Sequence, residues 1–229
     1  MVGGVCMLKK RRERTASLLH ERLYHSQGYA FIFGIDEVGR GPWAGPVVAG
    51  AVCLPITDSR LSPKLKGVKD SKMMTPRQRE SLVDTIKEVA LAWGIGKASS
   101  VEINDLGISP ATRLAMRRAL ESALETVDFE PSCLFIDSVL LPELPGIPQV
   151  SLVGGDARSL SIAAASVVAK VWRDDYMVEL DAEWPQYGFA AHKGYGTPQH
   201  QAALKEYGPS PLHRLYYKPI QALSDDDGD

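Results

Sequence analysis

Four carboxylates of this 229-residue chain lie where short apolar runs end. Asp36 and Glu37 follow FIFGI, Asp137 follows CLFI, and Asp156 comes directly after VSLVGG. Strands that are neighbours in one sheet can bring their ends together, so we expect these side chains to converge. Carboxylates held close together raise one another's pKa unless cations neutralise them. Mg²⁺ and Mn²⁺, which prefer oxygen ligands, are the counterions that this group predicts.

A pair of such ions would suit phosphoryl transfer. Two ions about 3.5 to 4 Å apart can hold both the attacking and the leaving oxygen. Successive residues of a regular strand point to opposite faces, so Asp36 and Glu37 could not both ligate from one. Because Gly39 and Gly41 follow closely, we expect the strand to end or bulge at this pair.

Each acidic residue also has a simpler interpretation. Asp156 is well placed to be the N-cap of a helix. Asp137 could be a turn residue together with Ser138, and Glu37 could face solvent. The occurrence of all four at the ends of elements favours the shared site.

A second set of residues could bind a substrate. Gly39 and Gly41 permit a close approach of the backbone to a ligand, and Arg40 between them is a fixed cation suited to phosphate. A tight turn between strands explains the glycines equally well. Lys72, directly before a helix start, is the lysine of its basic segment that we place on a phosphate; the other lysines there fit a solvated loop. Tyr195, between two glycines, could stack on a base or sugar, or be buried in a turn.

The elements that position these residues can be predicted from pattern. Apolar runs rich in β-branched or aromatic residues predict five strands, at 30–35, 46–54, 92–100, 133–137 and 148–153. Ser/Thr-Pro pairs predict helix starts at Thr75-Pro76, Ser109-Pro110 and Thr197-Pro198, and Gln78 completes a capping box for the first helix, which should last to about Leu91. The stretch 101–108 is expected to be a loop.

The small residues of segment 157–184 predict a long helix packed closely on a sheet. We expect the three early strands to be joined by short turns and the later strands to lie near helices. This order predicts an α/β protein with a mixed sheet flanked by helices, and not a doubly wound fold.

The composition is that of an ordinary globular protein, with 45% hydrophobic and 24% charged residues. The net charge of -2 combines a basic start, KKRRER, with an acidic end, SDDDGD, and so says little about partners. Three cysteines without CxxC spacing indicate free thiols in a reducing compartment. Since no apolar run approaches 18 residues, we expect a cytoplasmic protein without a membrane segment.

Five segments resemble bacterial ribonuclease HII, the type 2 ribonuclease H: DEVGRGPWAGPVVAGAV, DSK, FIDS, GGDARSLSIAAASVVAKVWRD and HKGYGT. The resemblance runs from about Tyr29 to about Tyr217. It implies a ribonuclease H-like fold, a mixed five-stranded sheet with flanking helices and a small C-terminal helical part. The chain would then divide into a basic N-terminal arm (1–28, a loosely packed helix or a flexible arm), a catalytic core (29–181), a C-terminal helical part (182–220) and an acidic tail (221–229).

The resemblance also implies an activity. Such an enzyme hydrolyses the RNA strand of RNA–DNA hybrids, and it cuts 5′ to a ribonucleotide at RNA–DNA junctions, including a single ribonucleotide in duplex DNA. The products carry a 3′-hydroxyl and a 5′-phosphate. Two ions, Mn²⁺ or Mg²⁺, are expected in the catalytic complex, and the protein is expected to be a monomer.

Roles follow for the acidic residues. The resemblance makes Asp36 the central metal ligand, with Glu37, Asp137 and Asp156 as the other three carboxylates. Asp174 of VWRD is a rival for the last role. Its place inside a helix, two turns past the small-residue stretch, favours a structural role instead.

Roles are also implied for the second set. Gly39, Arg40 and Gly41 would line the minor groove and contact the 2′-hydroxyl that distinguishes RNA from DNA. Tyr195 would pack on the sugar of the following deoxynucleotide, and Lys72 would hold a nearby phosphate. The basic arm could add affinity for any duplex sequence.

Two other functions compete with this one. A related metal-dependent nuclease or recombinase that processes DNA could use a similar carboxylate site. A catalytically silent nucleic-acid binding module would keep the carboxylates for structural reasons. A two-carboxylate glycosidase is disfavoured, because the basic loop and the GRG segment suit phosphates.

Overall fold

A computed structural model of the chain describes residues 16–225, and side chains as far as residue 222. One sheet has the strand order β3-β2-β1-β4-β5. Its strands are β1 (Ile32–Val38), β2 (Val47–Cys53), β3 (Ala92–Ala98), β4 (Cys133–Ile136) and β5 (Gln149–Ser151). β1 pairs with β2, and β2 with β3, in antiparallel fashion, whereas β1–β4 and β4–β5 are parallel. The predicted mixed five-stranded sheet is confirmed.

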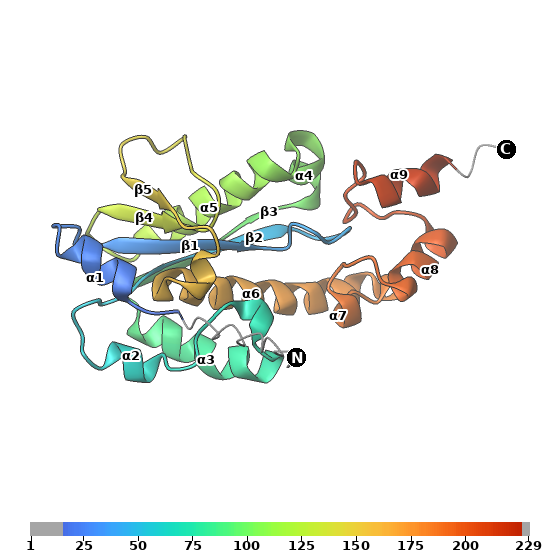
Figure 1. Cartoon of the computed structure of the whole chain (residues 1–229). Coiled ribbons are helices and arrows are strands. Elements are labelled where there is room, and N and C mark those ends of the chain that lie inside the picture. Colours follow the sequence, from blue (N-terminus) through green and yellow to red (C-terminus); the bar gives the residue numbers. More distant parts are fainter. Residues whose placement is uncertain (1–15, 226–229) are drawn as a thin grey trace, which may run out of the picture.

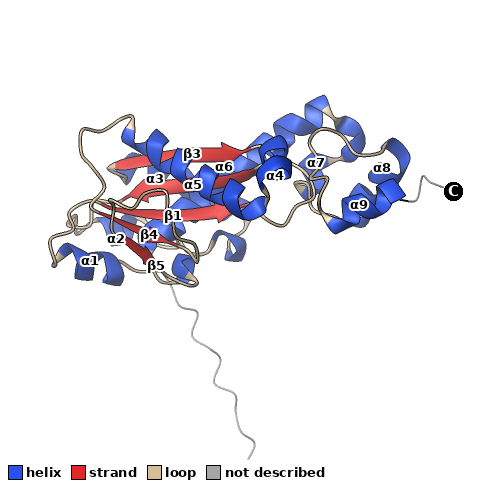
Figure 2. Ribbon diagram, turned by 90° about the horizontal axis from the view of Figure 1, so that it is seen from above, coloured by secondary structure: helices blue, strands red, loops and turns tan. Residues whose placement is uncertain are grey.

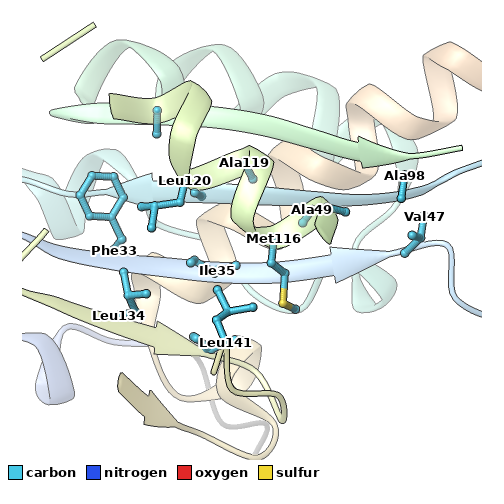
Figure 3. Packing of buried hydrophobic residues seen from close by; sticks show 14 of the residues in the cluster. Phe33, Ile35, Val47, Ala49, Ala98, Met116, Ala119, Leu120, Leu134 and Leu141 are labelled. Carbon is cyan, nitrogen blue, oxygen red and sulfur yellow. The ribbon is translucent and has the colours of Figure 1, made fainter. Parts of the chain in front are cut away.

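Helices cover both faces of the sheet (Figure 1). α4 (Ser100–Leu106) and α5 (Ile108–Leu124) lie on one face, where Met116 and Leu120 of α5 pack on Phe33 and Ile35 of β1 (Figure 3). α6 (Leu160–Glu183) covers the other face, and α3 (Pro76–Val89) packs against α6. The sheet therefore lies between two helical layers.

The long helix α6 lies directly on β1 and β2, as its small residues predict. A Cβ on Gly34 would overlap the backbone of Ser161 and Ile162, and a Cβ on Gly50 would lie 2.5 Å from the carbonyl oxygen of Ala165. Ala163 and its neighbours in the small-residue stretch are buried. The alternate residues of β1 that include Gly34 thus face α6.

Two of the predicted helix starts are confirmed. Thr75 caps α3 and forms the expected capping box with Gln78. Thr197 caps α8 (Pro198–Tyr207). In both cases a β-branched hydroxyl residue before proline supplies the acceptor for an N–H group of the first turn.

The third helix start is placed wrongly by the sequence pattern. α5 begins at Ile108, after Gly107 with a φ of 82°, so Ser109 lies inside the helix. The stretch 101–108, expected to be a loop, is mostly α4, which has a capping box formed by Ser99 and Glu102. That box was the signal for a helix here.

The expectation of short turns between the first three strands holds for β1–β2 only. The connection from β2 to β3 contains α2 (Leu61–Lys64), the 3₁₀ turn η1 (Ser71–Met73) and α3. The buried side chains of Val83 and Ile86 on α3 pack against α6, which turns this connection into an outer layer.

The segment before residue 29 contains a helix fixed to the core. α1 is Leu19–His25, and Leu18 before it is buried in the cluster beneath α6. Glu21 is fully buried and its Oε1 accepts hydrogen bonds from Ser159 Oγ (2.6 Å) and from the backbone N–H of Ser161 (3.0 Å). The KKRRER segment lies outside the described residues.

The C-terminal part lies beyond one end of the sheet (Figures 1 and 2). It comprises η3 (Pro185–Tyr187), α7 (Phe189–His192), α8 and α9 (Lys218–Asp225). Its apolar cluster includes Phe189, Leu204 and Ile220, and it is joined by Ala44 from the loop after β1. Within residues 16–225, no helix is long and apolar enough to cross a membrane.

Candidate active site

Asp36 and Glu37 lie inside β1 and not at its end. The antiparallel register with β2 runs without interruption through both residues to Val38. The expected strand end or bulge is therefore wrong on that side. The parallel pairing with β4 does stop at Ile35, opposite Ile136. In a regular strand the two carboxylates would point to opposite faces. Glu37 nevertheless lines a cavity together with Lys170 of α6, the helix that Asp36 faces, at a point where β1 has lost one of its two partners.

Asp36 faces α6 and is almost fully buried. Its Oδ1 accepts the backbone N–H of Glu37 at 2.8 Å, whereas its Oδ2 is buried without a hydrogen-bond partner in the described part of the chain. Burial raises the pKa of Asp36 well above its usual range, and the charge of Glu37 raises it further. Asp137 and Asp156 add to this rise, while the nearby Ser166 hydroxyl opposes it.

Glu37 is shielded as well, and does not simply face solvent. Its Oε1 lies 3.3 Å from Arg40 Nη1, and its Oε2 is buried with no partner among residues 16–225. Burial raises the pKa of this carboxyl, an effect that Arg40 partly offsets.

Asp137 combines a turn with a place in the site. It follows β4, and Ser138 after it has a φ of 61°, so the turn interpretation holds. Its Oδ1 also accepts the backbone N–H groups of Gly154 (3.0 Å) and Gly155 (3.3 Å). These bonds hold the loop that carries Asp156 beside the end of β4.

Asp156 does not cap α6. It lies in the 3₁₀ turn η2 (Gly155–Ala157), and the N-cap of α6 is Ser159, whose side chain accepts the N–H of Ile162. Asp156 is buried, and burial, followed by the charges of Asp70 and Asp137, raises its pKa to about 6. The N-cap alternative is wrong because the chain makes another turn before the helix begins.

Lys72 lies among these carboxylates. Burial lowers its pKa, but the charges of Asp36, Asp70, Asp156 and Glu37 outweigh burial and raise it. Asp70 also accepts the backbone N–H of Lys72 at 2.9 Å. Asp70 is thus a further acidic neighbour that sequence reasoning missed, although its place in the DSK segment was a signal.

The acidic residues suit a divalent cation by type. In the arrangement seen, no group of three or more His, Cys, Asp or Glu among the described residues is placed to hold a metal ion. The unpartnered oxygens of Asp36 and Glu37 are nevertheless hard anionic donors whose charge Arg40 and Lys72 offset only in part. Such groups need a cation or a proton, and Mg²⁺ or Mn²⁺ matches their chemistry.

A cavity of about 300 Å³ brings the expected substrate residues together. We call it the GRG cavity; its lining is Glu37, Val38, Gly39, Arg40, Gly41, Lys72, Lys170 and Tyr195. All five residues that the sequence assigns to substrate are present, next to one of the carboxylates. The arrangement can accept an anionic, sugar-bearing ligand beside Glu37.

Lys170 is a cavity residue that the sequence analysis missed. Its Nζ lies 2.6 Å from Asp174 Oδ1, one helical turn away on α6, and the other oxygen of Asp174 lies 3.4 Å from Arg79 Nη2. Two ion pairs therefore occupy Asp174, as its structural interpretation requires. The spacing of four residues between Lys170 and Asp174 was the available signal.

Two buried arginines hold the loop after β1. Arg214 donates to the carbonyl oxygens of Gly39 (2.6 Å), Arg40 (2.8 Å) and Gly45 (2.9 Å). Arg173 donates to that of Pro46 at 3.0 Å, and burial, then Arg214, lowers its pKa to about 10. Gly39 has a φ of 88°, and a Cβ there would overlap the Arg173 side chain. The sequence analysis missed both arginines.

Tyr195 is presented to the cavity and is 44% exposed, so the buried-turn alternative is wrong. A Cβ on Gly41 would lie 3.8 Å from Tyr195 Cε1, which places the ring against that glycine. The absent side chain at Gly41 leaves the face of the loop open beside an aromatic ring.

Comparison with known proteins agrees with this geometry. The Ribonuclease HII family profile matches residues 33–220. Ribonuclease HII of Roseiflexus castenholzii is 52% identical over 200 residues, which cover 87% of each chain. The ribonuclease HII solved in complex with PCNA from Archaeoglobus fulgidus is 27% identical, with a TM-score of 0.67 over 82% of this chain and 95% of that one. Bst-RNase HIII, solved in complex with Mn²⁺, shares the fold at 20% identity and a TM-score of 0.67, over 89% of this chain and 72% of that one. The chain therefore belongs to the ribonuclease HII family and is a ribonuclease H, an endonuclease of RNA–DNA hybrids.

Proposed function

We propose that this enzyme cuts on the 5′ side of a ribonucleotide at RNA–DNA junctions, including a single ribonucleotide embedded in duplex DNA. The products would carry a 3′-hydroxyl and a 5′-phosphate. The observation that carries the proposal is the GRG cavity, in which Gly39, Gly41 and Tyr195 lie directly beside Glu37. A sugar read by the loop would have its phosphate next to the carboxylates.

The backbone of the GRG segment supplies the recognition of the sugar. The carbonyl oxygens of Gly39 and Arg40 accept hydrogen bonds from Arg214. In a planar trans peptide the C=O and the following N–H point in opposite directions. The N–H groups of Arg40 and Gly41 therefore point away from Arg214. No residue from 16 to 225 accepts from them, so they would be able to donate to a 2′-hydroxyl, which DNA lacks.

The carboxylates supply the place of reaction. Asp36, Glu37, Asp137 and Asp156 would hold two divalent cations, Mn²⁺ or Mg²⁺. When bound, such a pair activates a water molecule and stabilises the leaving 3′-oxygen of the phosphodiester. Asp137 is already oriented by the N–H groups of Gly154 and Gly155. The complex of Bst-RNase HIII with Mn²⁺ supports the choice of metal by analogy of fold alone.

The two cations of the cavity have separate roles in this proposal. Lys72 balances the carboxylates in the structure described here, and with substrate it would hold the phosphate next to the cut. Arg40 is paired with Glu37 at 3.3 Å and would keep that carboxylate turned toward the cavity. Both side chains act by charge and position and transfer no proton.

We also propose that the enzyme is a monomer that works in the cytoplasm. Cys53 and Cys133 are free and buried, which supports a reducing compartment. Light scattering coupled to size exclusion tests the monomer, for which an eluting mass near 25.0 kDa is expected.

The decisive experiment is product mapping on three duplexes of one sequence: all-DNA, DNA with one ribonucleotide, and an RNA–DNA hybrid. We expect one cut, 5′ to the single ribonucleotide, with Mn²⁺ or Mg²⁺ present, and an extendable 3′-hydroxyl. Asp36→Asn should bind each duplex and cut none of them. Equal cutting of all-DNA would favour the DNA-processing nuclease, and binding without cutting by the unaltered enzyme would favour the silent module.

A further inference from the structure

Two consecutive residues of the C-terminal part hold the two sides of the GRG cavity. Arg214 binds the carbonyl oxygens of Gly39 and Arg40. His213 reaches the opposite side through a second histidine: its Nε2 lies 3.0 Å from His200 Nε2, and His200 Nδ1 lies 2.9 Å from the carbonyl oxygen of Tyr195. The tyrosine of the cavity is thus the end of a buried hydrogen-bond chain.

The partners of this chain fix where each proton lies. The Nδ1 of His213 lies 2.9 Å from the backbone N–H of Ser210, so it accepts and the proton of His213 is on Nε2. The carbonyl oxygen of Tyr195 can only accept, so His200 carries its proton on Nδ1. The Nε2–H of His213 therefore donates to the bare Nε2 of His200. Two neutral imidazoles with opposite tautomers satisfy these three bonds; the longer approach of His213 Nδ1 to the carbonyl oxygen of Ser210, at 3.3 Å, is then not a hydrogen bond.

The surroundings of the pair are mostly aromatic, apart from the hydroxyl of Ser210, which lies 2.9 Å from His213 Nδ1. Both imidazoles are fully buried. The ring of His192 stacks on His200 at 4.5 Å, and its Nε2 donates to the carbonyl oxygen of Tyr187. Phe189 lies edge-on to His200, and Tyr187 lies 4.9 Å from His213, ring centre to ring centre. Such packing leaves neither histidine room to move away from its partner.

We propose that His200 is a positioning residue that fixes Tyr195 for the reading of the sugar next to the ribonucleotide, and that His213 sets the tautomer in which His200 can do so. This inference rests on the proposed function of the GRG cavity. The backbone N–H of Thr197 donates to the same carbonyl oxygen at 2.8 Å, so the turn itself supplies one bond and His200 supplies the other. Two donors on one carbonyl fix the peptide plane after Tyr195, and with it the direction in which the ring leaves the backbone toward Gly41.

Three substitutions of His200 separate positioning from packing. In His200→Asn the side-chain amide nitrogen takes the place of Nδ1 and can still donate to Tyr195. In His200→Gln the amide reaches the place of Nε2, so the bond to His213 is kept and the bond to Tyr195 is lost. His200→Leu loses both bonds while filling similar space.

Cleavage of a duplex with one ribonucleotide provides the readout. We expect His200→Leu and His200→Gln to lose about tenfold in kcat/KM, mostly through KM, because each variant loses the hydrogen bond to the carbonyl oxygen of Tyr195. His200→Asn should stay within about threefold of the unaltered enzyme. On a long RNA–DNA hybrid, which offers no deoxynucleotide sugar beside the cut, all three should lose less. In a Tyr195→Ala background, His200→Leu should cost nothing further.

The outcomes separate this inference from the proposed function. If the unaltered enzyme cuts the single ribonucleotide and a folded His200→Leu cuts it equally well, the positioning role is wrong and the proposed function stands. An equal loss in the Asn and Leu variants would also overturn it. If the unaltered enzyme does not cut this duplex, both ideas fail. Should a variant not fold, ¹⁵N-histidine spectra of the unaltered enzyme still decide: Nδ1–H for His200 and Nε2–H for His213 are required, and any other assignment refutes the chain.

Discussion

The Nη2 of Arg214 lies 2.6 Å from the carbonyl oxygen of Gly39, across 175 positions of the chain. The same nitrogen also donates to the carbonyl oxygen of Gly45, at the far end of the loop. One buried guanidinium thus closes the loop after β1 on itself. The geometry of the GRG segment depends on a side chain from the C-terminal part as well as on its own glycines.

Replacing Arg214 should change the GRG cavity even when the positive charge is kept. Arg214→Lys keeps the positive charge but cannot make the forked contacts to several carbonyl oxygens. Each carbonyl left unsatisfied costs about 1–3 kcal/mol, so we expect a fall in the free energy of unfolding of that order, and a raised KM for the single-ribonucleotide duplex. Urea unfolding and steady-state kinetics provide the two measurements.

Arg117→Lys is the matched control. Arg117 lies on the solvent side of α5, and within residues 16–225 its one ion pair is with Glu121, one turn away. An exposed pair of this kind contributes little, so neither stability nor KM should change measurably. If Arg214→Lys behaves like this control, the loop does not need its forked donor.

The contact of α6 with the sheet predicts a strong effect of a single methyl group. In Gly50→Ala the new Cβ would meet the backbone of Ala165, and backbone cannot give way as a flexible side chain can. We expect a loss of at least about 1–3 kcal/mol in the free energy of unfolding, as for other overpacked cores. Gly146→Ala is the control, because nothing lies within 4 Å of a Cβ there. Equal Tm values for the two variants would show that α6 can shift at no cost.

Sequence patterns predicted the elements whose signals are local. The Thr75 and Thr197 caps and the small-residue helix are of this kind, since each depends on residues within one or two turns. That the four carboxylates hold metal together stays a prediction, and the expected end or bulge of β1 at Asp36 was wrong. Whether β1 ends at Asp36 depends on the strands that pair with β1. β2 still pairs with β1 at Asp36 and Glu37, whereas the pairing with β4 has already ended at Ile35.

Arg214, which sequence reasoning missed, acts over a long distance. Its contacts with Arg40 and Gly39 cross 174 and 175 positions of the chain, and no spacing marks such contacts. A buried arginine that binds carbonyl oxygens has no acidic partner to reveal it in the sequence. The tertiary fold alone brings these groups together.

Removal of divalent metal should expose the charge imbalance at Asp36. Burial raises the pKa of this carboxyl well above its usual range, so the ionised form is disfavoured in the fold without a cation. Stability therefore falls as pH rises from the unfolded pKa toward the folded one, and the penalty persists at pH 7. We expect Asp36→Asn to raise the Tm of the metal-free enzyme and to reduce the Tm gain that Mn²⁺ gives the unaltered protein.

Glu121→Gln serves as the control for that experiment, because Glu121 is exposed on α5 and should leave the response to Mn²⁺ unchanged. Differential scanning calorimetry with EDTA and with Mn²⁺ measures both effects. A metal-free Asp36→Asn protein with a lower Tm than the unaltered one would mean that the carboxylate is satisfied in a way that its unpartnered Oδ2 does not suggest.

The buried histidine pair predicts how the fold responds to acid. Burial lowers the pKa of both His200 and His213 from the ordinary 6.5 to about 4. Between pH 6.5 and about 4, these histidines bind protons in the unfolded chain but not in the folded protein. The stabilising contribution of the two neutral histidines is therefore complete above pH 6.5 and is lost as pH falls toward 4. Each histidine adds about 1.4 kcal/mol per pH unit to that loss. Urea unfolding at steps from pH 7 to pH 5 should therefore show a shallower decline for His200→Asn, which removes one of the two groups. Parallel declines would mean that His200 is not kept neutral, which would remove the basis of its bond to His213, because a charged imidazole has no acceptor nitrogen.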